Sequence, residues 1–280
     1  MIARLAILIA AFTVAACGTE APKLELSERP KRVVSLDYCA DQYVLKLADP
    51  EQILAVSPNA TKSFSYMREN ALGMPTVRPS AEDVLALKPD LVVRSYGGGP
   101  NIVGFLERAG VPVLQVSWAT KLDGDEAGAI PTIIKHMSIG LGQPDRGQNL
   151  IVEFRSRLSA LKANAASGNV LYMTPSGATT GPASLVHEMF VAAGLENYET
   201  EPGWRPLPLE RLTYSKPDRV AAAFYESRQN QFHTWSASNH PVARDLLAQS
   251  TSIPLHGAWT ACGGWFVLDA VEALAAGDAQ

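Results

Sequence analysis

The chain has 280 residues, 47% of them hydrophobic and 19% charged, and carries a net charge of -4 at pH 7. This composition is typical of a globular protein that buries one large core or two modest ones. The basic residues are scattered and form no Lys/Arg run, so we expect no nucleic-acid partner. After residue 17, no stretch approaches the ~20 uninterrupted apolar residues of a membrane-spanning helix.

Residues 1–16 are predicted to form a secretory signal peptide. One early charge, Arg4, precedes an apolar run that is too short for a mature membrane helix and ends in small residues. The sequence Val14-Ala-Ala-Cys17 also resembles a bacterial lipobox, in which Cys17 would be lipidated. Ordinary signal-peptidase cleavage after Ala16 fits the same residues. In both cases we expect an exported protein whose residues 17–31 form a tether.

Beyond the tether, short apolar strands alternate with helices. The predicted strands are 32–36, 53–57, 91–95, 113–116, 169–173, 220–224 and 252–255. The predicted helices between them are 40–47, 81–87, 102–109, 185–193, 242–249 and 265–275. Strands separated by single helices indicate βαβ units, so residues 32–143 and 167–280 should each form an α/β lobe around a parallel sheet.

The middle of the chain has a different pattern. Residues 123–141 are predicted to be helical, and Gly142-Gln-Pro144 then interrupts. The following stretch, 145–166, has apolar residues at helical spacing from Leu150 to Leu161. A helix of this length between two α/β halves predicts one bridging helix, 144–166, which would limit how far the lobes swing apart. One more core helix is the alternative.

Two stretches of the chain, 80–93 and 208–221, align without a gap. Glu82 matches Glu210, and Lys88-Pro89-Asp90 matches Lys216-Pro217-Asp218. Each stretch is predicted to be a short helix followed by an apolar strand. The repeat predicts two similar lobes with one glutamate at the same place on each. An acidic residue in the first turn of a helix also has a purely structural use, because it complements the helix dipole.

Several motifs together resemble the periplasmic binding proteins of ABC importers for ferric siderophores, haem and vitamin B12. They are Arg32-Val-Val-Ser-Leu-Asp, the run from Ala81 to Val92, Gly110-Val-Pro-Val, Gly194-Leu-Glu-Asn and the second Lys-Pro-Asp. The resemblance covers about residues 32–275. It implies two Rossmann-like lobes joined by a single long α-helix and a cleft between them for a large chelate. It further implies a monomer that works in the periplasm and delivers its ligand to an ABC permease dimer.

The ligand site is expected at the carboxyl ends of the strands, where loops line the crevice of an open α/β sheet. Aromatic residues are frequent in those loops, and flat rings suit a corrin, porphyrin or chelate face. The resemblance also places Trp204 and Trp259 where vitamin-binding members have cleft tryptophans, and Arg78 near a ligand arginine of hydroxamate-siderophore binders. The ligand-binding candidates are Tyr38, Tyr66, Arg78, Tyr96, Trp118, Trp204, Arg205, Tyr225 and Trp259. Packing is the alternative role for each aromatic residue.

The sequence leaves cobalamin, haem and a ferric siderophore open as ligands. Cobalamin is preferred because of the tryptophans and because no cationic cluster suits a highly anionic catecholate complex. The histidines show no metal-ligand spacing, so we expect no metal site and no cofactor. The alternative function is an exported α/β enzyme such as a hydrolase, but the sequence contains no nucleophile elbow and no acid/base constellation.

We also expect particular roles for two further pairs of residues. The resemblance implies that Glu82 and Glu210 dock onto arginine-rich pockets of the two permease subunits. Once Cys17 is assigned to lipidation, Cys39 and Cys262 are left as an even pair, each expected in a loop at the cleft, one per lobe. They either form a disulfide that pins the lobes together or remain separate buried thiols, since pairing requires Cα atoms within ~7 Å.

Overall fold

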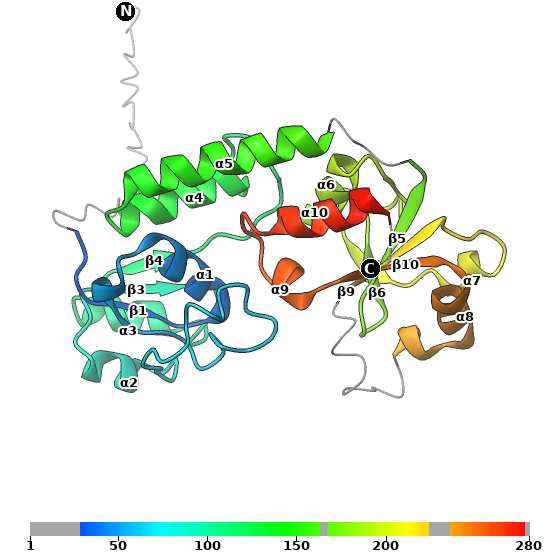
Figure 1. Cartoon of the computed structure of the whole chain (residues 1–280). Coiled ribbons are helices and arrows are strands. Elements are labelled where there is room, and N and C mark those ends of the chain that lie inside the picture. Colours follow the sequence, from blue (N-terminus) through cyan, green and yellow to red (C-terminus); the bar gives the residue numbers. More distant parts are fainter. Residues whose placement is uncertain (1–28, 163–166, 224–235, 278–280) are drawn as a thin grey trace, which may run out of the picture.

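The computed structural model describes residues 29–162, 167–223 and 236–277. The predicted signal peptide, most of the tether with Cys17, and Tyr225 lie outside the described residues. Figure 1 shows two lobes side by side, with one long helix running along both of them. Each lobe contains a parallel sheet covered by helices, so the predicted α/β fold with two lobes is confirmed.

Both sheets have the same strand order. In the first lobe the order is β2 (Ile53–Ala55), β1 (Val33–Ser35), β3 (Leu91–Arg94) and β4 (Val113–Gln115). In the second lobe it is β7 (Glu196–Asn197), β5 (Asn169–Met173), β9 (Arg219–Ala223) and β10 (Thr251–Leu255). All neighbouring strands in these two sheets are parallel. In each sheet the first strand therefore lies between the second and the third, as a repeated lobe requires.

The aspartate of the repeated Lys-Pro-Asp motif has the same structural task in each lobe. Asp90 accepts hydrogen bonds from the backbone N–H groups of Lys31 and Arg32, both at 2.8 Å, just before β1. Asp218 accepts one from the backbone N–H of Asn169, at 2.7 Å, at the start of β5. Each carboxylate thus ties the third strand of its sheet to the beginning of the first. This part of the repeat is explained by folding.

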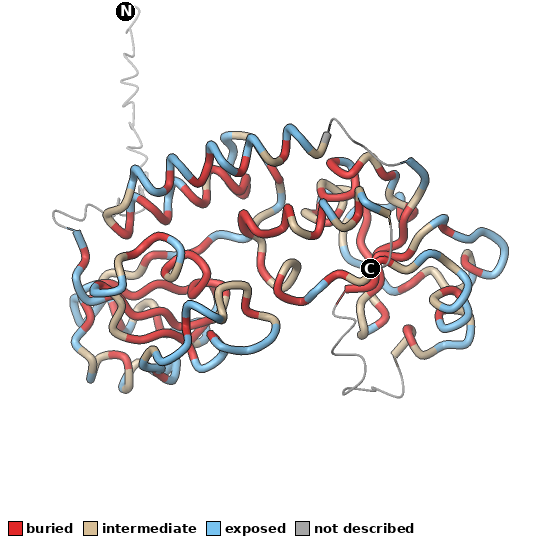
Figure 2. The backbone as a smooth tube through the Cα atoms, viewed as in Figure 1, coloured by how far each residue is buried: buried red, intermediate tan, exposed pale blue. Residues whose placement is uncertain are grey.

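Successive apolar side chains along a strand are buried on opposite faces of the sheet. Val33, Leu91 and Val93 face one side of the first sheet, and Val34 and Val92 face the other. The first side belongs to a large cluster that continues through the helices between the lobes into the second sheet. Two smaller clusters cover the outer faces of the two sheets. The described residues therefore form one large core shared by both lobes and three smaller clusters, the third around Val56, Ala60 and Ala71. Figure 2 shows the buried residues of both lobes in red.

The bridging helix is α5 (Pro144–Lys162), which has 19 residues and is about 28 Å long. It packs antiparallel against α4 (Ile130–Gly140) and also contacts α10 (Val267–Ala276) of the second lobe (Figure 1). Its apolar residues Leu150, Phe154 and Leu158 are buried in the shared core. The predicted amphipathic helix is confirmed, whereas the lobe boundaries at 143 and 167 stay a prediction.

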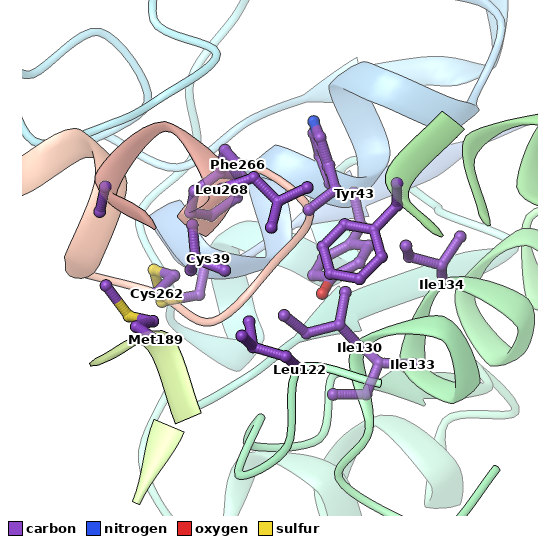
Figure 3. Packing of buried hydrophobic residues seen from close by; sticks show 14 of the residues in the cluster. Cys39, Tyr43, Leu122, Ile130, Ile133, Ile134, Met189, Cys262, Phe266 and Leu268 are labelled. Carbon is purple, nitrogen blue, oxygen red and sulfur yellow. A yellow bond between two sulfur atoms is a disulfide. The ribbon is translucent and has the colours of Figure 1, made fainter. Parts of the chain in front are cut away.

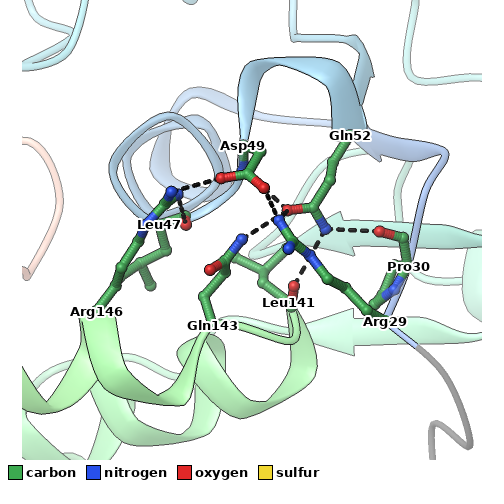
Figure 4. Close-up of polar contacts among 8 residues, drawn as sticks. All are labelled: Arg29, Pro30, Leu47, Asp49, Gln52, Leu141, Gln143 and Arg146. Atoms are coloured by element: carbon green, nitrogen blue, oxygen red, sulfur yellow. Dashed lines mark hydrogen bonds and ion pairs between the residues drawn. The ribbon is translucent and has the colours of Figure 1, made fainter.

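A polar cluster holds the turn between α4 and α5 (Figure 4). Asp49 lies between two arginines and forms ion pairs with both Arg29 and Arg146. Beside it, the buried Gln52 side chain donates to the backbone oxygen of Leu141 at 3.2 Å. The cluster fixes the start of the bridging helix on the first lobe, at the point where the chain leaves the tether.

The remaining helices are α1 (Tyr38–Leu47), α2 (Ala81–Ala86), α3 (Ile102–Arg108), α6 (Leu185–Ala192), α7 (Leu209–Leu212) and α8 (Pro241–Gln249), with 3-10 turns at Pro50–Gln52 and Ala237–Asn239. The structure differs from the sequence predictions in several places, and β7 is one strand that was not predicted. The helix predicted from residue 123 begins only at Ile130, because the preceding segment folds back on itself with Thr120 and Lys121 donating to the carbonyl of Gly128. The second lobe also contains an unpredicted antiparallel pair, β6 (Ala178–Thr180) and β8 (Trp204–Pro206). Trp259 lies on a short helix, α9 (Gly257–Thr260), where a loop was expected.

Candidate functional site

A cavity of about 390 Å³ lies between the two lobes. Its volume is within the usual range of small-molecule sites. The walls come from the segment after β4, from β5, from the start of α6, from β8 and from the segment between α9 and α10. The lining residues are Trp118, Ala119, Thr120, Tyr172, Ala183, Ser184, Leu185, Val186, Met189, Gly203, Trp204, Thr260, Ala261, Cys262, Gly263 and Val267.

Two tryptophans face this cavity from different lobes. Trp118 follows β4 and is 65% exposed, and Trp204 begins β8 and is 62% exposed. Such exposure of large apolar side chains at a cavity indicates a binding surface. Trp204 pairs in register with Thr180 of β6, and its ring meets Tyr172 edge-on at 5.9 Å. The unpredicted β6–β8 pair therefore explains how Trp204 is held at the cavity.

The described part of the cavity lining is uncharged. Its hydroxyl-bearing side chains are Thr120, Tyr172, Ser184 and Thr260. Ser184 is occupied as the N-cap of α6, because its hydroxyl accepts from the backbone N–H of His187 at 3.2 Å. Burial raises the pKa of the Tyr172 hydroxyl, which keeps it neutral. Lys121, next to the lining residue Thr120, is neutralised by Glu188 of α6 at 2.8 Å. The site thus offers aromatic faces and neutral donors and acceptors.

One wall of the cavity carries a disulfide. The structure joins Cys39 of α1 to Cys262, with their Cα atoms 5.5 Å apart. Cys39 lies in the first turn of α1, where a loop was expected, because Asp37 caps the helix just before it. Of the two alternatives left open by the sequence, the structure has the bonded one. Next to the bridge, a Cβ atom added to Gly263 would lie 2.4 Å from the Cβ of Ala119, so the two lobes meet here at a position that requires glycine.

A second aromatic group lies at the carboxyl end of the first sheet. The Tyr38 ring meets Phe64 at 4.8 Å and Tyr96 at 5.9 Å, both edge-on. Burial raises the pKa of both tyrosine hydroxyls. The Tyr96 loop is held by Asp37, whose carboxylate accepts hydrogen bonds from the backbone N–H groups of Ser95, Tyr96 and Gly97 at 2.7, 3.0 and 2.8 Å. The fold thus brings together two predicted ligand residues, Tyr38 and Tyr96.

The other predicted ligand residues lie away from the cavity lining. Tyr66 donates to Asp269 of α10 at 2.9 Å and stacks on Phe266, and burial raises the pKa of Tyr66 to about 12. Trp259 is half-buried and packs edge-on against His256 at 4.4 Å.

The two predicted ligand arginines also lie outside the lining. Arg78 is exposed and forms an ion pair with Asp83 at 2.9 Å. Arg205 is exposed on β8, and its side chain alternates with that of its cavity-lining neighbour Trp204. The roles of Tyr66, Trp259, Arg78 and Arg205 in binding stay predictions.

The two repeated glutamates occupy equivalent exposed places. Glu82 lies in the first turn of α2 and Glu210 in the first turn of α7. Within the described residues, neither carboxylate has a hydrogen-bond or ion-pair partner. The carboxylate of the neighbouring Asp83, by contrast, accepts a hydrogen bond from the Ser80 hydroxyl and pairs with Arg78. The helix-capping work on α2 is therefore done by Ser80, whose hydroxyl accepts from the Asp83 N–H, and Glu82 is left free for another role.

Residues 29–162, 167–223 and 236–277 lack two further features. These residues contain no group of three or more His, Cys, Asp or Glu side chains that could hold a metal ion. None of their helices is both long and apolar enough to cross a bilayer.

Comparison with known proteins identifies the family. The family model described as "Periplasmic binding protein" matches residues 33–238. The chain therefore belongs to the periplasmic binding protein family, whose members are solute-binding proteins and whose name implies a periplasmic location. The cobalamin-binding proteins of two Halobacterium salinarum strains are 26% identical over 241 residues, covering 81% of this chain. The chain spans 63% of the length of these relatives.

Solved structures agree on the fold. The haem-binding protein RhuT from Roseiflexus sp. RS-1 superposes with a TM-score of 0.67 at 23% identity, covering 88% of this chain and 98% of that one. The vitamin B12-binding protein BtuF of Vibrio cholerae superposes with a TM-score of 0.63 at 22% identity, covering 89% of this chain and 96% of that one. At these identities the likeness concerns the fold.

Sequence reasoning did not single out most of the lining residues, among them Thr120, Ser184 and Thr260. Tyr172 and Met189 line the cavity, although the sequence patterns of β5 and α6 indicate only buried core positions. Phe64 was not proposed as a ligand residue, but its ring contacts Tyr38. Only the periodicity of β5 and α6 could have signalled Tyr172 and Met189, and periodicity identifies a buried face without telling whether that face meets a core or a cavity.

Proposed function

We propose that this protein is the substrate-binding component of an ABC import system that captures cobalamin or an iron chelate between its lobes and delivers it to a membrane permease. Cobalamin is the ligand that the cavity fits best. The observation that carries this choice is the uncharged, aromatic lining around Trp118 and Trp204. The halobacterial relatives named as cobalamin-binding proteins give the choice independent support.

Charge separates cobalamin from haem and from catecholate iron complexes. Haem carries two propionate groups, and catecholate iron complexes carry several negative charges. Burying such anions without a cationic partner costs several kcal/mol. The amide groups around a corrin ring are neutral and need hydrogen-bond partners such as Thr120, Thr260 and Tyr172. A ligand larger than the cavity would extend between the two exposed indole rings.

A fluorescence titration tests the proposal. Cyanocobalamin, haemin, a ferric hydroxamate and a ferric catecholate would each be added to the purified mature protein, and tryptophan quenching recorded. We expect quenching by cyanocobalamin at low micromolar concentration or below, with weaker responses to the anionic ligands. Tighter binding of haemin or a catecholate would overturn the choice of cobalamin, and no binding of any of the four would overturn the proposed function.

The permease partner is proposed from the two repeated glutamates. Glu82 and Glu210 are exposed and carry no side-chain partner among the described residues, so both can pair with arginines of a two-fold permease. Charge-assisted pairs at two separated points fix orientation and speed encounter. A monomeric binding protein suffices for this arrangement, because each lobe supplies one of the two points.

We also propose that the protein performs no catalysis. A hydrolase would need a base beside a nucleophile, and within the described lining of the cavity no histidine or carboxylate accompanies Ser184. Retention of an unaltered ligand after prolonged incubation, checked by mass spectrometry, tests this part.

Lipidation of Cys17 is proposed from the sequence alone. It would be tested by the mass of the mature N-terminus in membranes of the producing cell. A Cys17→Ser variant found unchanged in the membrane fraction would contradict it.

A further inference from the structure

Three consecutive residues at the start of α1 connect the two halves of the cleft. Asp37 holds the loop of Tyr96, Tyr38 stands between Phe64 and Tyr96, and Cys39 is bonded to Cys262 of the other lobe. One helical turn therefore touches the aromatic group of the first lobe and, through the disulfide, the cavity wall of the second.

The disulfide belongs to a row of contacts along one face of α1. Tyr43, one turn after Cys39, donates its hydroxyl to the backbone oxygen of Gly263 at 3.1 Å. Its ring also meets Trp265 edge-on at 5.4 Å. Lys46, at the end of the same face, lies over the Trp265 ring at 5.9 Å from the ring centre. The segment from Cys262 to Trp265 is thus fixed to α1 by a covalent bond, a hydrogen bond and ring contacts. Figure 3 shows the disulfide and the Tyr43 side chain.

The start of this segment and the two residues before it form a wall of the cavity. Thr260, Ala261, Cys262 and Gly263 all line it. Figure 3 shows the disulfide beside Met189, another lining residue. Gly263 lies close against Ala119, so a shift of this segment would also displace the Trp118 side of the cavity.

We infer that the Cys39–Cys262 disulfide is a positioning element of the ligand site, which holds the cavity wall in its binding geometry before the ligand arrives. The inference rests on the proposed function and deepens it. Without the bond, binding would have to order this segment and bring the lobes to the right separation. That ordering cost would be subtracted from the affinity.

The route by which a reductant can reach the disulfide leads to a second expectation. Cys39 is 4% and Cys262 7% exposed, so the bridge is shielded from the outer surface. Because Cys262 lines the cavity, the cavity is the route by which a small reductant reaches it. A bound ligand then protects the disulfide from reduction, which a bridge serving only overall stability would not show.

The first experiment compares the oxidised wild type with the Cys39→Ser/Cys262→Ser double variant. Both would be titrated with cyanocobalamin and with haemin well below their melting temperatures. We expect the double variant to bind about tenfold more weakly, through faster dissociation. The matched control is Leu106→Ala, which destabilises the buried side of α3 in the first lobe without touching the cavity.

The possible outcomes distinguish a failure of the proposed function from a failure of the inference about the disulfide. A wild type that binds none of cyanocobalamin, haemin, a ferric hydroxamate and a ferric catecholate removes the proposed function and this inference with it. A wild type that binds, together with unchanged affinity in the double variant, overturns this inference alone. Equal loss of affinity in Leu106→Ala and in the double variant also overturns it, because the loss then follows general destabilisation.

The second experiment uses the wild type only and does not depend on the folding of a variant. One dithiothreitol molecule transfers two electrons and two protons to the disulfide, giving two thiols and cyclic oxidised dithiothreitol. The appearance of thiols is followed by alkylation and mass spectrometry, with and without saturating cyanocobalamin. We expect the ligand to slow reduction at least tenfold. Equal rates in a protein that demonstrably binds the ligand would overturn the inference.

Discussion

Trp118 and Trp204 belong to different lobes of the chain and line one cavity of about 390 Å³. The two residues are far apart in sequence. Trp118 follows β4 of the first sheet, and Trp204 is held by the pairing of β8 with β6. Both are large apolar side chains that are exposed at the cavity, which makes them the first residues to test.

Replacing either tryptophan with alanine should weaken binding of cyanocobalamin by roughly 1 to 3 kcal/mol, the scale of losing an aromatic contact at a binding site. Isothermal titration calorimetry measures the change. Phe105→Ala is the control, since Phe105 is 53% exposed on α3 and lies outside the cavity lining. Affinity that is unchanged in both tryptophan variants would place the ligand elsewhere.

The Glu82→Gln/Glu210→Gln double variant should keep its ligand affinity and melting temperature but lose uptake and permease binding. The reason is that both side chains are exposed and unpaired among the described residues, so neutralising them removes only the charge offered to a partner. Glu107→Gln with Glu196→Gln is the matched control, with one exposed glutamate from each lobe. Normal uptake by the first double variant would refute the docking role.

Asp41 should make stability depend on pH. Burial raises its pKa to about 6, although hydrogen bonds from the N–H and hydroxyl of Ser57, at 3.0 and 2.6 Å, oppose the shift. The folded state therefore holds the proton more tightly than the unfolded chain does. The resulting stability is fully present below about pH 4 and is lost as the pH rises through about 6.

The size of this effect is up to about 3 kcal/mol in the free energy of unfolding. Asp41→Asn keeps an acceptor for the Ser57 N–H and has no titration. Urea unfolding from pH 4 to 8 should show the wild type losing stability relative to Asp41→Asn over this interval. Parallel pH profiles of the two proteins would contradict the assignment.

Asp37→Ala should destabilise the protein by about 2 to 4 kcal/mol, because one buried carboxylate accepts the backbone N–H groups of Ala40, Ser95, Tyr96 and Gly97. Denaturant unfolding measures this loss. Asp83→Ala, which removes a partly exposed carboxylate next to Glu82, is the control and should cost much less. Comparable losses in the two variants would show that Asp37 does not organise the Tyr96 loop.

Much of the fold was predictable because the strands and helices follow from local patterns of apolar residues. Apolar strands of 3 to 5 residues and the spacing from Leu150 to Leu158 gave the two parallel sheets and the bridging helix. The repeated Lys-Pro-Asp motif predicted two equivalent lobes, and the equal strand orders bear this out. The short pair β6 and β8 was missed, since three-residue strands next to glycine and proline have no distinctive period.

The site was predictable only as a set of candidates. Loops at the ends of parallel strands must gather at one edge of a sheet, so Tyr38, Tyr96, Trp118 and Trp204 were all expected near the cleft. Which of them share a surface depends on side-chain direction and on how the lobes meet. Tyr66 illustrates this limit, because its hydroxyl is engaged with Asp269 of a helix more than half the chain away.

The sequence by itself determined the class of fold, its duplication and the kind of residue that the cleft presents, because these depend on periodicity and on chemistry within short segments. Only the tertiary structure decided that Trp118 and Trp204 line one cavity and that Cys39 is bonded to Cys262. Contacts of that kind depend on the relative placement of distant segments, here separated by 223 residues for the disulfide, and no local pattern encodes that placement.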